Sequence, residues 1–259
     1  MRHACLMRVL VIAAVAFARS AGAQILETET ARQLRNGQIE VGAGYELQHS
    51  REGNEIAVPI TIELGVTNRL GLLVEPVPYT AIRPKSGIQA TGLGDLEITM
   101  SYLVRRESSR FPALALAAEE KIPTARNTLI GTGKADHTAY VIASKMLGRF
   151  DTHINAGYTV VGSPKGQSLQ NRVSGALATE FAVTATTLLY GEVLGSTSAG
   201  GEGESAGVAS PIPEASGDEI FGTLGIAHSF ARGALFSLGV TRDNVGATQI
   251  RPAITLWFR

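Results

Sequence analysis

Apolar and polar residues alternate along much of this chain with a period of two. The pattern is clearest in five segments, at residues 38–48, 56–67, 95–104, 153–160 and 250–258. In the second segment, Ile60, Ile62 and Leu64 alternate with Thr61 and Glu63. Successive side chains of a β-strand point to opposite faces, so this spacing predicts strands with one apolar and one polar face.

Weaker alternation marks seven further segments, at residues 70–79, 113–122, 138–147, 173–181, 188–194, 220–230 and 234–241. Glu120 falls on the apolar phase of its segment. Together the segments predict about twelve strands of ~9–11 residues, the length that a tilted strand needs to cross a bilayer. No later segment has the ~18 consecutive apolar residues of a membrane helix.

The expected connections alternate between short and long, as the tight periplasmic turns and longer outer loops of membrane barrels do. Long connections are predicted at residues 49–55, 80–92, 123–136, 161–170, 195–217 and 243–248. The fold class that follows is all-β, a closed antiparallel up-and-down transmembrane β-barrel of about 12 strands. An even number of strands places both ends of the barrel on the periplasmic side.

The first 23 residues have the features of a cleaved signal peptide. Arg2 and Arg8 are followed by an apolar run over 9–18, and residues 21–23 (AGA) supply the small side chains that signal peptidase requires. A run of roughly 10 residues is too short to span a bilayer, which needs ~20. We therefore expect a periplasmic N-terminal segment at 24–37 and a barrel at 38–259. Residues 24–36 could be a periplasmic tail or a short helix that plugs the lumen.

Charge and cysteine content narrow the class of protein. The whole chain has 23 basic and 23 acidic residues. Cleavage removes Arg2, Arg8 and Arg19, which leaves 20 basic residues against 23 acidic ones and argues against a nucleic-acid partner. Cys5 is the only cysteine and lies in the signal peptide, so the mature chain has no disulfide, thiolate nucleophile or cysteine metal site.

Three features favour a barrel whose apolar face meets lipid. The signal peptide exports the chain, and only 18% of its residues are charged, against ~25% in a typical soluble domain. A barrel of about twelve strands is also too wide for side chains to fill, a limit reached at ~8 strands. The sequence therefore predicts a protein of the bacterial outer membrane with a wet, polar lumen.

Charged residues on the polar phase of the strands are the candidate lumen lining. One interpretation is a charged pore that biases permeation, and the other is a set of opposite charges that pair and hold a narrow lumen nearly shut. Aromatic residues near strand ends predict girdles at the lipid boundary, among them Tyr102, Tyr158, Tyr190 and Trp257. The candidate lumen residues are Glu40, Glu46, Glu63, Asp95, Glu97, Glu119, Lys121, Glu180 and Arg251.

We expect no catalytic residue, cofactor or metal site. Residues 203–207 (GESAG) match a nucleophile-elbow string, but no helix follows them. Residues 131–134 (GTGK) lack the remaining positions of a phosphate loop. The histidines of the mature chain have no metal-ligand spacing; they are His49, His137, His153 and His228. A lipid hydrolase with a serine and a histidine at one rim, and a structural or adhesive barrel, remain alternatives.

Three stretches resemble a known outer-membrane family. Residues 94–97 (GDLE), 115–123 (ALAAEEKIP) and 129–145 (LIGTGKADHTAYVIASK) are similar to the transporter family labelled "putative MetA-pathway of phenol degradation". The resemblance implies an outer-membrane barrel that passes small, often hydrophobic compounds, with no catalytic residues to transfer. The C-terminal strand resembles the signal read by the barrel-assembly machinery, although Arg259 follows the terminal aromatic residue.

The expected function is passive passage of small molecules, hydrophobic or aromatic ones included, through an outer-membrane channel that is not an enzyme. Its expected partners are outer-membrane lipid, the assembly machinery during biogenesis, and the permeant.

Overall fold

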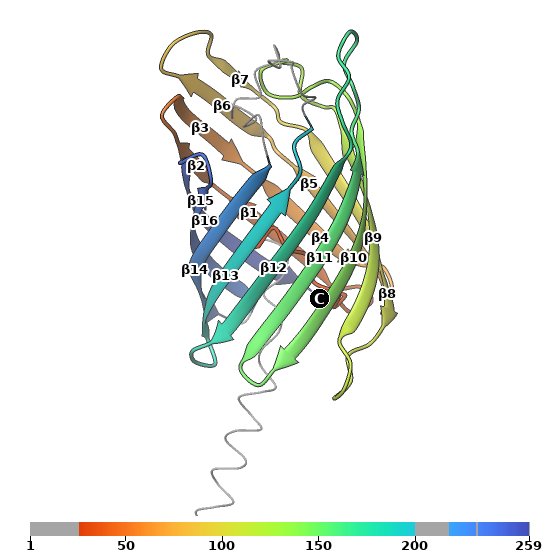
Figure 1. The fold of residues 1–259 in the computed structure, drawn as a ribbon. Helices are drawn as coiled ribbons and strands as arrows, with labels where there is room; N and C mark the ends of the chain where they lie inside the picture. Colours follow the sequence, from red (N-terminus) through yellow and green to blue (C-terminus); the bar gives the residue numbers. More distant parts are fainter. Residues whose placement is uncertain (1–25, 200–217, 232, 259) are drawn as a thin grey trace, which may run out of the picture.

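The computed structural model describes residues 26–199, 218–231 and 233–258. The predicted signal peptide, the GESAG string and part of the longest loop lie outside these residues. Within them the chain forms one antiparallel sheet and no helix, and its first and last strands pair to close a barrel (Figure 1). None of the described residues belongs to a helix long and apolar enough to cross a membrane.

Twelve strands make the circumference of the barrel, each paired antiparallel with its two neighbours. This confirms the predicted closed twelve-stranded barrel. The strands are β1 (Ile39–Gly44), β4 (Ile60–Gly65), β5 (Leu70–Pro76), β8 (Leu96–Arg105), β9 (Ala113–Ile122), β10 (Asp136–Leu147), β11 (Phe150–Val160), β12 (Arg172–Ala182), β13 (Thr187–Ser196), β14 (Glu219–Ala231), β15 (Ala234–Asp243) and β16 (Thr248–Phe258).

Four shorter strands extend one side of this wall: β2 (Glu46–His49), β3 (Gly53–Val58), β6 (Tyr79–Pro84) and β7 (Ala90–Gly92). The strand predicted at 56–67 is interrupted at Pro59, whose missing N–H cannot join the ladder. The strand predicted at 38–48 is interrupted at Tyr45. The long connection predicted at 80–92 is wrong, because residues there form β6 and β7, which pair with β3 and with each other.

We call the end of the barrel with the connections 66–69, 106–112, 148–149 and 183–186 the turn end, and the opposite end the loop end. At the loop end β7 pairs with β6 alone, and the chain after β9 lies against the link between β7 and β8. Thr124 Oγ1 donates to the carbonyl oxygen of Gly94 at 2.8 Å, and the N–H of Ala125 donates to Asp95 at 2.9 Å. Loop contacts thus complete the wall where strand pairing stops.

The outer surface of the barrel is apolar. Large hydrophobic side chains of neighbouring strands are about half exposed there, including Met100, Leu116, Val141 and Ile154. Their neighbours on the opposite phase, such as Thr99 and Asn155, are buried. So much exposed apolar surface suits a protein that is surrounded by lipid, which agrees with the predicted inversion of the two faces.

Two aromatic residues predicted at the lipid boundary lie inside instead. Tyr190 is 4% exposed and packs with Ala178, Ala227 and Leu235. A Cβ atom at Gly225 would overlap the Tyr190 ring, so the glycine leaves the space that the ring occupies. The indole N–H of Trp257 donates to Glu40 on the inner face. Both residues have the inward phase of their strands, and that phase decides their position. Tyr102, Tyr158, Phe230 and Phe258 do lie on the exposed outer face.

Candidate functional site

The inner face of the barrel carries many carboxylates and few basic side chains. Of the nine predicted lumen residues, all but Asp95 lie on the inward phase of a strand. Asp95 lies in the link before β8, and its carboxylate accepts the hydrogen bond from Ala125. That contact positions the loop-end wall, and Gly131 packs closely against the same carboxylate.

The structure adds inward carboxylates that the sequence analysis missed. Glu75 and Glu192 lie on the inner face of β5 and β13. The alternation of the sequence does indicate that Glu75 and Glu192 face inward, because the adjacent Val74 and Val193 have the outward, lipid-facing phase. The alternation around Glu75 was weak, since Leu73 shares its inward face.

Only part of this charge is neutralised within the wall. Arg251 Nε binds Glu46 at 3.0 Å, and Lys121 pairs with Asp136 across the β9–β10 ladder. Among the described residues, several inward carboxylates have no basic group within ion-pair distance; they are Glu63, Glu75, Glu97, Glu119 and Glu180. The inner face therefore carries both ion-paired and unpaired acidic side chains.

Residues 26–37 lie inside the barrel and have no helix (orange-red in Figure 1). The sequence left two alternatives for this segment, a periplasmic tail and a short helix that plugs the lumen. The structure agrees with a position in the lumen, but the segment is not helical. Thr28 donates from N and Oγ1 to Glu192 at 2.6 and 2.5 Å, and the N–H of Ala31 donates to Ser144 Oγ at 2.8 Å. We call this stretch the lumen segment.

The lumen segment continues toward β4, β5 and β8. Ser101 Oγ donates to Gln33 Oε1 at 2.9 Å. A Cβ atom at Gly65 would overlap the carbonyl oxygen of Arg35, and one at Gly71 would overlap the Gln33 side chain. The missing side chains at these two glycines thus leave room for the Arg35 backbone and for the Gln33 side chain. The segment thus touches strands on most sides of the lumen, and its first described residue, Leu26, packs against Tyr190.

Arg32 is the main ionic anchor of the lumen segment. Its Nη1 lies 2.7 Å from both carboxylate oxygens of Asp151, and its Nη2 lies 2.8 Å from Glu107. Lys145 Nζ contacts the other oxygen of Glu107 at 3.1 Å. Nearer the N-terminal end of the segment, Glu27 pairs with Arg251. Charge-assisted bonds from a planar guanidinium to two carboxylates fix both position and orientation.

A serine and a histidine meet beneath the lumen segment. Ser144 Oγ lies 2.9 Å from His153 Nδ1, and Asp151 Oδ1 lies 3.8 Å from His153 Nε2. Ser144 is 1% exposed, and its hydroxyl accepts the N–H of Ala31. A hydroxyl covered in this way has no room for a substrate carbonyl, so the geometry fits docking of the segment better than acyl transfer. No group of histidine, cysteine, aspartate and glutamate in the described residues has the geometry to hold a metal ion.

The pKa values of two carboxyl groups outside the strands depend on docking of the lumen segment. Burial, which is the largest cause, and the nearby Glu119 and Glu27 together raise the pKa of Glu29 to about 7. Burial alone would also raise the pKa of Glu107. Hydrogen bonds from Arg32, from the N–H of Met146 and from Lys145 outweigh burial and lower it.

Docking of the lumen segment should therefore weaken as the pH rises from about 4.5 to about 7. A carboxyl whose pKa is raised by docking favours the docked state below its ordinary value of 4.5, and this contribution disappears as pH rises through about 7. Glu107 has the opposite sign, and its contribution is lost only at pH values below its lowered pKa. We expect single-channel conductance to rise several-fold between about pH 5 and pH 8.

Glu29→Gln should flatten this pH dependence, because the amide does not titrate. Glu52→Gln, on the exposed turn between β2 and β3, serves as the control and should keep the wild-type slope. Conductance measured in planar bilayers across the pH range checks both variants. An unchanged slope in Glu29→Gln would rule out this residue as the titrating group.

Comparisons with known proteins support the architecture. No family model matches the chain, and no curated protein matches it in sequence. Among solved structures, a COG4313 outer membrane channel from Pseudomonas putida F1 aligns with a TM-score of 0.65 at 14% identity, covering 88% of this chain and 98% of that one. The fold is that of an outer-membrane channel. At this identity the likeness concerns the fold alone.

Two further porins align over nearly their whole length. The NanC porin has a TM-score of 0.58 at 8% identity and covers 84% of this chain and 98% of its own. A KdgM porin in complex with oligogalacturonate has a TM-score of 0.55 at 9% identity, covering 85% and 99%. These matches confirm the outer-membrane barrel fold but not the transporter-family label suggested by the sequence motifs.

Proposed function

We propose that this protein is a passive outer-membrane channel for small molecules and that its electronegative lumen favours cations over anions. The observation that carries the proposal is the excess of unpaired inward carboxylates, among them Glu63, Glu97 and Glu119. Rings of acidic side chains give cation selectivity in other pores, because they raise the local concentration of cations and repel anions. No energy source or cofactor is part of the proposal.

The permeant in this proposal is small and polar or cationic. A hydrophobic or aromatic body would be accommodated when it carries a polar or charged group, since the lumen wall offers hydroxyls and carboxylates rather than a continuous apolar path. The lumen segment limits the permeant further, because it fills part of the cross-section through contacts with β8, β10 and β13.

In the cell, lipid would surround the apolar band and the turn end would face the periplasm, after signal-directed export and insertion by the barrel-assembly machinery. The hydrolase alternative is not proposed, because Ser144 is covered by the lumen segment. The adhesive alternative has no feature of the described residues in its favour.

Neutralising two inward carboxylates tests the proposal. A carboxylate about 8 Å from a permeating ion contributes ~0.5 kcal/mol in a water-filled lumen. Each removed charge acts on the cation and the anion with opposite sign, so the double variant Glu97→Gln, Glu119→Gln should lower the cation-to-anion permeability ratio by up to about 30-fold at low salt, and by less at high salt, where charges are screened. Reversal potentials across a potassium chloride gradient measure the ratio.

Glu120→Gln is the matched control. Glu120 is the next residue along β9 but has the opposite, outward phase, where its carboxylate pairs with His137. Its removal should leave the permeability ratio unchanged. An anion-selective wild-type protein, or equal effects of the inward and outward substitutions, would overturn the proposed selectivity.

A further inference from the structure

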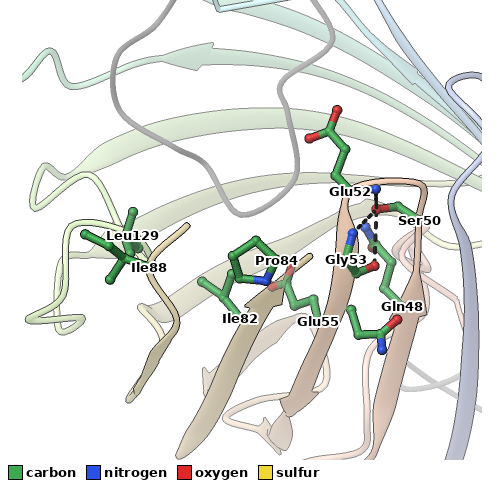
Figure 2. A pocket seen from close by; sticks show the side chains of 10 residues that line it. Gln48, Ser50, Glu52, Gly53, Glu55, Ile82, Pro84, Ile88 and Leu129 are labelled. Carbon is green, nitrogen blue, oxygen red and sulfur yellow. Dashed lines mark hydrogen bonds between the residues drawn. The ribbon is translucent and has the colours of Figure 1, made fainter. Parts of the chain in front are cut away.

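A hollow of about 130 Å³ lies at the loop end, apart from the lumen segment. The hairpin of β2 and β3 forms one side, and β6 and two loop residues form the other (Figure 2). Its wall is apolar at Ile82, Pro84, Ile88 and Leu129, and two acidic residues line it, Glu55 and the exposed Glu52.

Glu55 has an oxygen without a partner. Its Oε2 is buried, and no hydrogen-bond donor reaches it in the part of the chain that the structure describes. No basic side chain among the described residues lines the hollow. The hydroxyl of Ser50, which also lines the hollow, is used within its own turn, where it accepts the N–H groups of Glu52 and Gly53.

A buried acceptor without a donor is costly, and a buried charge without a partner more so. Gln48 and Asn54 also line the hollow, but their side-chain amides do not reach Glu55 Oε2. A ligand that brings a positively charged donor would remove this cost. The carboxylate therefore selects an ammonium-type group over an anion or a neutral acceptor.

The remainder of the hollow defines the body of the ligand. Ile88 is 80% exposed and, with Leu129, lies on the side of the hollow away from the β2–β3 hairpin (Figure 2). A ligand resting against these two side chains would bury apolar surface that is now in contact with water. The volume is close to that of the ~150 Å³ apolar cavity that accepts benzene in another protein. The body that fits is therefore about the size of one aromatic ring.

We propose that this hollow is a binding site for small amphipathic cations, in which Glu55 pairs with an ammonium group and the apolar wall holds a body of about one ring. As a capture site for permeants it rests on the proposed channel function, because it lies at the loop-end mouth ahead of the electronegative lumen. The binding step itself needs no transport.

Isothermal titration of the full-length protein in zwitterionic detergent tests the site with benzylammonium as the probe, at about pH 8, where such amines stay protonated. Benzyl alcohol has nearly the same shape without the charge and should bind at least tenfold more weakly. Methylammonium has the charge without the ring and should also bind weakly. Equal affinities for benzylammonium and benzyl alcohol in the wild-type protein would overturn the proposal without recourse to any variant.

Two substitutions assign the binding to this hollow. Glu55→Gln keeps the side-chain shape and should weaken benzylammonium binding at least tenfold. Glu120→Gln should leave it unchanged, because Glu120 has the outward phase of β9 and does not line the hollow. Ile88→Ser should weaken benzylammonium several-fold, since the change removes apolar contact alone. Equal affinity of benzylammonium for the wild type and Glu55→Gln would mean that the probe binds outside this hollow or partitions into the detergent.

The outcome is independent of the channel measurements. Loss of cation selectivity in the bilayer with intact benzylammonium binding would remove the proposed function and keep the site. Intact cation selectivity without benzylammonium binding would support the proposed function and overturn the proposed site.

Discussion

Deleting residues 26–36 is expected to raise the single-channel conductance of the protein several-fold. The lumen segment touches β8, β10 and β13 through hydrogen bonds and lies against β4 and β5 at two glycines. Water and ions would take its place. The barrel itself should remain closed, because all of its strand pairing lies within residues 39–258. The measurement is conductance in planar bilayers at neutral pH.

The deletion also exposes polar groups that the segment now satisfies, such as Glu192 and Ser144. In a water-filled lumen these groups gain hydration instead, so we expect a folded barrel with lowered thermal stability. Retention of β-structure in circular dichroism is the control for folding. A folded deletion variant with the conductance of the wild type would show that the segment does not limit permeation.

Strand number and facing were predictable from the sequence because a two-residue period is a local property. Glu40 and Glu119 were placed on the inner phase by their apolar neighbours, and the structure has them there. The same period assigns Tyr190 and Trp257 to the inner face, where they lie in the structure. Their predicted position at the lipid boundary rested on the general enrichment of aromatic residues there and was wrong. Residues 80–92 contain Pro84 and Gly87, which are typical of loops, and their pairing depends on β3, a distant strand.

The path of the lumen segment could not be predicted in this way. Its contacts join residues far apart in the chain, 164 residues apart for Thr28 and Glu192 and 113 apart for Ala31 and Ser144. No periodicity in residues 26–37 indicates which wall residues they meet. Only the closed barrel brings β10, β11 and β13 around the segment. The unpartnered oxygen of Glu55 is likewise a property of the assembled loop end, where three separate stretches of chain meet.

Arg32→Ala should release the lumen segment far more often than it is released in the wild type. The guanidinium lies 2.7 Å from both oxygens of Asp151, whose side chain is 7% exposed. Glu107 would keep Lys145, but Asp151 would keep only His153, whose Nε2 lies 3.8 Å away. Removing one partner of a buried ion pair costs about 3 kcal/mol or more. In Arg32→Ala this cost destabilises the docked state relative to the undocked state, because water reaches Asp151 once the segment has left.

A cysteine introduced at Ala31 reports this release, because the side chain there is fully buried against Leu103 and Ile142 while the segment is docked. The only native cysteine is Cys5, in the predicted signal peptide. Since each 1.4 kcal/mol is a factor of ten in an equilibrium constant, Arg32→Ala should speed maleimide labelling of Ala31→Cys about 100-fold. Arg35→Ala removes the same type of side chain from the same segment. Arg35 is exposed and has no ion pair among the described residues, so labelling should stay within about twofold of wild type. Equal acceleration by both substitutions would indicate that overall positive charge, and not the Arg32–Asp151 contact, keeps the segment in the lumen.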